Sequence, residues 1–347
     1  MKRKLFWMCL LVAITPLSKI HGQDIQSPVD YLSAIQNAQV SMNQKYMVYM
    51  SAAAHGRRAR KVEKLRNAVL ESIEDCRNKT IDLPIYKGDN SLRQSSIDYI
   101  KLCYNIFNED YGKIVNMEDI AERSYDDMQA YLLLREITNQ KISGAVAKMD
   151  SAARTFAAKY QIQLVDSKNE LDQKLDESGK VNDYADKVYL AFFKCNWEDG
   201  KIVSALNKQK MTEVEQSRMS LLKFVQEGLS SLDTLKSFQQ DPSLYIACKE
   251  ALMNYRKLAS EVLPKQTDYF LKKESFEKTQ QHFNQMADDQ KTRQVVDTYN
   301  QAVKDMNDAA NAFNQNINTS NQLRSQIINN WNEAEKNFYD SHIPKYR

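Results

Sequence analysis

Residues that interrupt regular secondary structure are scarce in this chain. It holds only 8 glycines and 6 prolines among 347 residues, and its many Ala, Leu, Lys, Glu and Gln residues are good helix formers. Hydrophobic residues make up 42% of the chain and charged residues 27%, which supplies enough apolar surface for packed helices. The sequence therefore predicts an all-α fold with long helices.

The chain is longer than one hydrophobic core usually supports, which favours two domains. Several stretches of the first half resemble stretches of the second half in the same order. The pairs are LRNAVLESI (65–73) with LLKFVQEGL (221–229), YKGDNSL (86–92) with FQQDPSL (238–244), RSYDDMQ (123–129) with ESFEKTQ (274–280), and MDSAARTF (149–156) with MNDAANAF (306–313). We expect two tandem, internally duplicated antiparallel helical bundles, with coiled-coil packing, at residues 23–165 and 183–347. A charged connector is expected at 166–182.

Local signals predict several helix ends. Ser27 and Pro28 form a cap and first-turn pair, and a second helix is expected to begin at Asn90 or Ser91. Thr212 and Glu215 have the spacing of a capping box, which predicts a helix start near Met211. Pro264 is expected to end the helix that begins near Ser243.

The N-terminus has the pattern of a secretory signal. Lys2, Arg3 and Lys4 precede an apolar run at residues 6–14, and Gly22 is a small residue at a plausible cleavage position. The run is too short to cross a bilayer. We expect export, with cleavage near Gly22 and no transmembrane segment in the mature chain. Cys9 lacks the context of a bacterial lipidation site.

Removal of residues 1–22 changes the charge balance. It takes away four of the 48 basic residues and none of the 45 acidic ones, so 44 basic and 45 acidic residues remain. A nearly neutral chain gives no reason to expect nucleic-acid binding, and no single-stranded RNA module or glycine-rich phosphate loop is present.

Four cysteines follow the expected signal: Cys76, Cys103, Cys195 and Cys248. An even number in an oxidising compartment invites disulfides. However, Cys76 and Cys103 are not expected to lie level in a helical hairpin, and Cys195 continues an apolar helical stripe. Buried free thiols are the favoured interpretation, and disulfides are the alternative.

The sequence contains no recognisable metal or catalytic motif. The mature histidines are not preceded by Glu at position i−3, and no His-x-x-x-His or Cys-x-x-Cys pair occurs, so we expect no metal or cofactor. Glu118, Glu122 and Asp126 are four residues apart. A solvated helix face is the favoured reading of these carboxylates over a calcium site or an acid–base pair. No motif places a histidine base beside a nucleophile, and no enzyme activity is expected.

The densest charge cluster lies in the long helical stretch 31–77. Six cations fall within residues 57–66, countered by Glu63, directly after a shift in the apolar stripe that predicts a kink at His55 and Gly56. The run suggests an anion-binding or partner-binding surface; the alternative is a solvated helix face paired with nearby acids. The candidate residues are His55, Arg57, Arg58, Arg60, Lys61 and Lys64.

Stretches spread over nearly the whole mature chain carry a family resemblance: SAAAHGRRARKVEKLR, YKGDNSLRQSSIDYIKLCYNIFNEDYGKIVNMEDIAERSYDDMQAYLL, VNDYADKVYLAFFK, DYFLKKESFEK and IINNWNEA. They resemble the leptospiral-type surface protein family of unknown function, exported helical proteins of Gram-negative bacteria. The resemblance implies a periplasmic or cell-surface location and brings no catalytic residues.

Together these features predict a non-enzymatic envelope or surface protein. The favoured role is interaction or scaffolding, with an envelope or extracellular protein, or an acidic glycan, as partner. The alternative is a receptor that holds a glycan, lipid or other small ligand between its helices.

Overall fold

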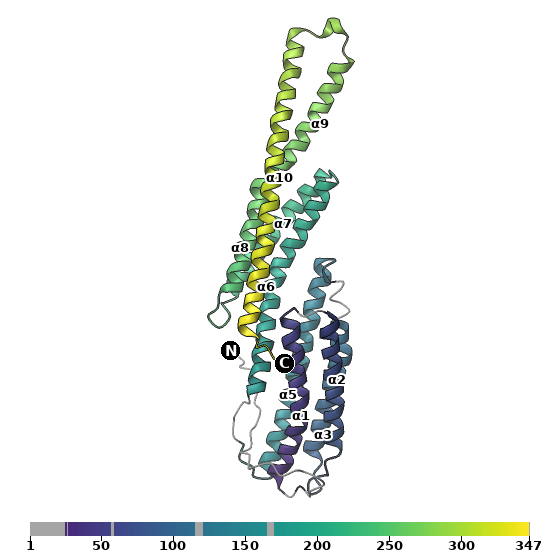
Figure 1. The fold of residues 1–347 in the computed structure, drawn as a ribbon, viewed down its shortest axis with the longest axis vertical. Helices are drawn as coiled ribbons and strands as arrows, with labels where there is room; N and C mark the ends of the chain where they lie inside the picture. The colour runs from purple at the N-terminus through teal and green to yellow at the C-terminus, as the bar shows by residue number, and fades with distance from the viewer. Residues whose placement is uncertain (1–24, 26, 57–58, 115–120, 165–169, 347) are drawn as a thin grey trace. The chain divides into compact units, whose positions relative to one another are not determined.

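The structure, a computed structural model, describes residues 25, 27–56, 59–114, 121–164 and 170–346. Every regular element in these ranges is a helix (Figure 1), and two isolated bridges, Tyr86 to Asp89 and Phe238 to Asp241, close tight loops. The predicted all-α fold is confirmed. The expected signal segment lies outside the described residues. Within the described residues, no helix is both long and apolar enough to cross a bilayer.

The chain divides into two compact units. Met1–Tyr184 and Lys336–Arg347 form the first, and Ala185–Glu335 form the second. The last residues of the chain therefore belong to the first unit, whereas the sequence assigned them to the second bundle. Residues 170–182 of the expected connector lie in helix α6 (Glu170–Asn207). Their charges form pairs one turn apart, Lys174 with Glu170 and Lys180 with Asp176, which support a helix.

The first unit contains a bundle of long helices. These are α1 (Pro28–Ala54), α2 (Ala59–Ile81), α3 (Ser91–Asn105) with the π-helical turn η1 (Ile106–Asp110), and α5 (Tyr125–Lys159). Each of α1, α2, α3 and α5 packs against the next in this order. As predicted, Ser27 caps α1 by accepting a hydrogen bond from the Asp30 backbone NH, at 3.1 Å. The predicted break is also confirmed, because α1 ends at Ala54 and Gly56 has a φ of 61°.

The second unit contains most of α6 together with α7 (Met211–Thr234), α8 (Ser243–Lys257), η2 (Leu258–Val262), α9 (Leu263–Gln285), the short 3₁₀ turn η3 (Asp288–Gln290) and most of α10 (Arg293–His342). Two local predictions are corrected. Pro264 lies in the first turn of α9, directly after η2, instead of ending a helix. Helix α7 begins at Met211 as predicted, but no side chain caps it, and Glu215 binds Arg218 instead.

The same local geometry occurs twice, 152 residues apart. Arg66 binds Glu63 and the Phe107 carbonyl, and Arg218 binds Glu215 and the Ala259 carbonyl. We call each of these arrangements an arginine clamp. At the helix starts that follow the two tight loops, Asp89 accepts from the Ser91 NH and Asp241 from the Ser243 NH. The buried residues follow the same spacing, since Val69 and Ile73 correspond to Leu221 and Val225. The sequence match of Leu65 with Leu221 is therefore shifted by one helical turn.

Two further sequence expectations can be compared with the structure. All four cysteines of the described chain are free and buried, as expected, and burial raises the pKa of the Cys76 thiol to about 11 and that of Cys103 to about 12. Of the three carboxylates expected on one helix face, Glu122 and Asp126 do not share a helix. Glu122 lies in the turn before α5, which Ser124 caps through the Asp127 NH, and Glu118 is outside the described residues.

Candidate functional site

His55 is held in a structural role at the end of α1. Its Nδ1 donates to the Ser51 carbonyl at 2.6 Å, and its Nε2 lies 3.4 Å from Asp340 Oδ1. The Ser51 hydroxyl in turn accepts from the Tyr346 backbone NH at 3.0 Å. His55 therefore ties the end of α1 to the C-terminal segment within the first unit, and only 9% of its side chain is exposed.

The basic run divides into two groups. Arg60, Lys61 and Lys64 are exposed on the first turns of α2, whereas Arg57 and Arg58 lie outside the described residues. Arg66 is mostly covered because it forms the first arginine clamp, which also holds the pKa of Glu63 below its usual value. The three exposed cations are the described candidates for contact with an external anion.

A pocket of about 450 Å³ opens at the break between α1 and α2. We call it the tyrosine pocket. All of its lining residues belong to the first unit. They include Ala53, Ala54 and Gly56 from the break itself, the rings of Tyr49, Tyr111, Tyr131 and Tyr339, and the polar side chains of Glu63, Arg135, Asn139 and Asn182. The pocket therefore lies beside the exposed cations, since Val62 and Glu63 come from the same turns of α2.

The aromatic wall of the pocket is part of the core. Phe107 stacks on Tyr111 with centroids 4.7 Å apart and meets Tyr46 edge-on at 5.0 Å. Tyr49 meets Tyr111 edge-on at 5.6 Å, and the hydroxyls of Tyr46 and Tyr111 are 3.2 Å apart. Burial raises the pKa of Tyr46, Tyr49 and Tyr111. These hydroxyls therefore stay protonated at neutral pH and can donate hydrogen bonds.

Arg135 supplies positive charge to the same wall. Its guanidinium lies 5.6 Å from the centre of the Tyr131 ring, a distance typical of a cation–π contact. Its charge also lowers the pKa of Tyr49 and Tyr111, opposing the larger effect of burial. Asn139, one turn along α5, donates to Asp183 at 3.1 Å. The wall thus combines flat aromatic surface, a cation and amide groups.

This chemistry suits reversible ligand binding. Stacking surfaces with a few oriented polar groups are typical of small-ligand sites. The described lining contains no serine, cysteine or histidine. Across the described residues, no three His, Cys, Asp or Glu side chains are grouped so that they could hold a metal ion.

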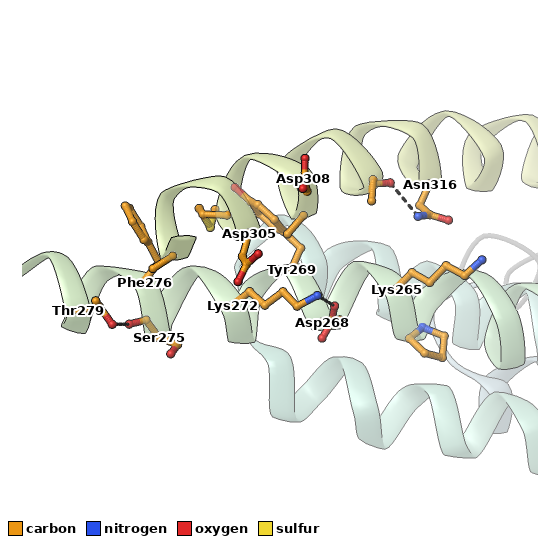
Figure 2. A pocket seen from close by; sticks show the side chains of 15 residues that line it. Lys265, Asp268, Tyr269, Lys272, Ser275, Phe276, Thr279, Asp305, Asp308 and Asn316 are labelled. Atoms are coloured by element: carbon orange, nitrogen blue, oxygen red, sulfur yellow. Dashed lines mark hydrogen bonds and ion pairs between the residues drawn. The ribbon is translucent and has the colours of Figure 1, made fainter. Parts of the chain in front are cut away.

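A second hollow lies between α9 and α10 in the second unit and has a volume of about 820 Å³. Figure 2 shows Tyr269 and Phe276 on α9 beside Asp305 and Asp308 on α10. We call it the α9–α10 groove. Three alanines of α10 also line it, so side chains fill little of the space between the two helices.

Comparisons of the chain with protein-family models, with curated proteins and with solved structures give no match. The resemblance to the leptospiral-type surface protein family therefore stays a prediction.

Proposed function

We propose that this chain is an exported, non-enzymatic binding protein of a bacterial envelope, and that its tyrosine pocket holds a carboxylated sugar unit of an acidic glycan. The observation that carries this proposal is that Arg135 lines a pocket that four tyrosine rings also line. The pocket also lies next to the exposed cations of α2.

Each part of the pocket has a matching feature in such a ligand. Aromatic rings pack against the apolar face of a sugar, and tyrosine hydroxyls and asparagine amides satisfy its hydroxyl groups. The planar guanidinium of Arg135 can bind a carboxylate through two parallel hydrogen bonds. Arg60, Lys61 and Lys64 add a positive field that attracts further acidic units and that salt weakens.

The test is calorimetric titration of the mature chain with uronic-acid oligosaccharides and with their neutral counterparts. We expect the acidic sugars to bind. Arg135→Gln should weaken this binding by about tenfold or more, because it removes a charged hydrogen-bonded contact. Arg154→Gln is the matched control, because Arg154 lies on the same helix and pairs with Asp150. Equal affinity for acidic and neutral sugars, or equal effects of the two substitutions, would contradict the proposal.

Export is supported by the charge and hydropathy pattern of residues 1–22. N-terminal sequencing of the protein isolated from its host should begin near Gln23. A chain that still carries Met1 would show that the segment is retained.

Internal duplication is supported by the two arginine clamps and by the two tight loops, which occur with one constant spacing. Residues 59–110 and 211–262 should superpose without insertion or deletion in a crystal structure. A superposition that needs a shifted helix register would argue against common descent of the two segments.

An interaction or scaffold role is the second candidate function, and the α9–α10 groove favours it. Crosslinking in the host, followed by mass spectrometry, should capture a protein through residues of this groove. Crosslinks that come only from other surfaces would leave the groove without this role.

A further inference from the structure

We infer that the α9–α10 groove binds the same groove of a second copy of this chain, so that two helical arms form one four-helix bundle. This inference specifies the partner in the interaction role proposed above. It does not depend on the tyrosine pocket.

The two helices leave the rest of the second unit as a pair. Figure 1 shows the α9–α10 arm continuing past the turn between α6 and α7, where α6 ends at Asn207 and α7 begins at Met211. No residue of α9 beyond Gln266 is fully buried. Two helices alone can cover only the surfaces that face each other, and stable helical layers normally cover the adjacent faces too.

The arm is held together by aromatic pairs along its inner seam. Tyr269 stacks on Phe313 with centroids 4.3 Å apart, and Phe283 stacks on Tyr299 at 4.2 Å. These contacts fix the spacing of the two helices over several turns. The arm therefore presents its groove on a defined surface.

The groove itself has the composition of an uncovered helix contact. Ala302, Ala309 and Ala312 line its α10 side with small side chains, which permits close approach of another helix because interaxial distance depends on the side chains at the contact. Leu271 is 63% exposed and borders the groove, three residues after Asp268 and four before Ser275. An apolar surface of this kind is a candidate protein contact.

The charges identify the occupant. The α9 side of the groove carries two lysines, Lys265 and Lys272, and one aspartate, Asp268, and the α10 side carries Asp305 and Asp308 (Figure 2). A twofold axis parallel to the two helices would bring α9 of one copy against α10 of the other, with the same patch used on both copies. Lysines would then face aspartates on both sides. Lys272 already lies 2.8 Å from Asp268, but both side chains are about half exposed, so water weakens that pair.

Two charge-reversed variants provide the test. Lys265→Glu with Lys272→Glu makes both sides of the groove acidic, and Asp305→Lys with Asp308→Lys makes both sides basic. In analytical ultracentrifugation the unaltered mature chain should be a dimer, and each variant alone should dissociate about tenfold or more readily, since like charges would face each other. An equimolar mixture of the two variants should restore the dimer.

The controls separate this inference from the proposed function. Lys278→Glu with Lys304→Glu makes the same change in net charge at exposed positions outside the groove lining and should leave the dimer intact. Leu271→Ser should weaken the dimer without any change in charge. Circular dichroism verifies that each variant is folded, and sugar binding should be unchanged in all of them. A monomeric native chain, or variants that fail to associate when mixed, would overturn the inference; capture of a different protein at an otherwise monomeric arm would do so as well.

Discussion

The two arginine clamps hold equivalent helical frames whose surroundings differ. In the first unit the clamp residue Phe107 belongs to the aromatic cluster behind the tyrosine pocket. In the second unit the corresponding clamp residue is Ala259, which is fully buried. The backbone arrangement therefore occurs twice, while the large side chains that form the pocket wall occur only in the first unit.

The positions around the clamp show the same contrast. Tyr49 and Tyr111 line the pocket, and the residues 152 positions later are Lys201 and Leu263. A clamp made of one arginine, one glutamate and one carbonyl sets the distance between helices through hydrogen bonds. Because the clamp tolerates different neighbours, the same helix arrangement can occur with different adjacent side chains.

Phe107→Ala should produce the largest difference in stability between the two units. It removes a buried ring that contacts Tyr46 and Tyr111, so we expect the first unit to lose about 3–5 kcal/mol in free energy of unfolding. Trp197 and Trp331, the two tryptophans among the described residues, lie in the second unit. The urea midpoint measured by circular dichroism should therefore fall for the first unit. Tryptophan fluorescence follows the second unit separately.

The half-exposed ring Phe276 supplies the control for that measurement. Phe276→Ala should cost much less, because this side chain keeps part of its surface in water. Equal losses for the two substitutions would show that the aromatic cluster is not a core.

Arg324→Gln should destabilise the second unit by about 3 kcal/mol, because it leaves a buried carboxylate without its cation. Arg324 binds Asp199 through two hydrogen bonds of 2.7 and 2.8 Å, and only 6% of the Asp199 side chain is exposed. In the first unit Lys141 contacts Asp110 at 2.6 Å with 46% of the lysine exposed. Lys141→Gln should therefore cost about 1 kcal/mol or less. Urea unfolding of both variants measures the difference, and a larger loss for Lys141→Gln would reverse the predicted order.

Arg66→Gln and Arg218→Gln should have nearly equal effects, of about 1–3 kcal/mol each, because each removes a paired glutamate contact and a bond to a carbonyl in the π-helical turn. The lengths of the carbonyl bonds are 2.9 and 3.0 Å. Hydrogen exchange of η1 and η2 should rise in the corresponding variant. A large effect at only one clamp would show that the two frames are not energetically equivalent.

Local residue patterns predicted both ends of α1 well. Ser27, Pro28 and Gly56 act through their own backbone and side-chain preferences, so their effects can be read without the fold. The similar stretches of the two halves were harder to align. Apolar residues recur about every turn, so a shift of one turn still pairs Leu65 with Leu221 and keeps the apolar pattern matched. The better signal was the Glu-x-x-Arg spacing of both clamps, at Glu63 with Arg66 and Glu215 with Arg218.

The pocket could not be predicted from sequence spacing. Arg135, Asn182 and Tyr339 come from segments far apart in the chain, and only the fold brings them to one wall. His55 was singled out as a binding residue, but its contacts with Ser51 and Asp340 are internal to the first unit. Tyr49 and Tyr111 are both core residues and pocket lining.

Acidic pH should affect the stabilising contributions of the two tight loops differently, and this is the smallest of the predicted effects. Asp89 accepts hydrogen bonds from Lys159 at 2.7 Å, from the Ser91 NH at 2.9 Å and from Tyr160 at 3.2 Å. Led by the bond from Lys159, these interactions hold the pKa of the Asp89 carboxyl well below its usual value. Because the carboxyl pKa is lower in the folded state than in the unfolded state, the ionised carboxylate stabilises the fold at pH values above the usual pKa of about 4. That stabilisation is lost progressively as the pH falls below about 4 toward the lowered pKa. Asp89→Asn should therefore lower the urea midpoint of the first unit at pH 7 and have less effect at pH 3.

Asp241→Asn is the matched control, since Asp241 makes the same contact with Ser243 at 2.8 Å. If the two variants respond alike at both pH values, Lys159 and Tyr160 add nothing to the first loop, and the two frames are equivalent there as well.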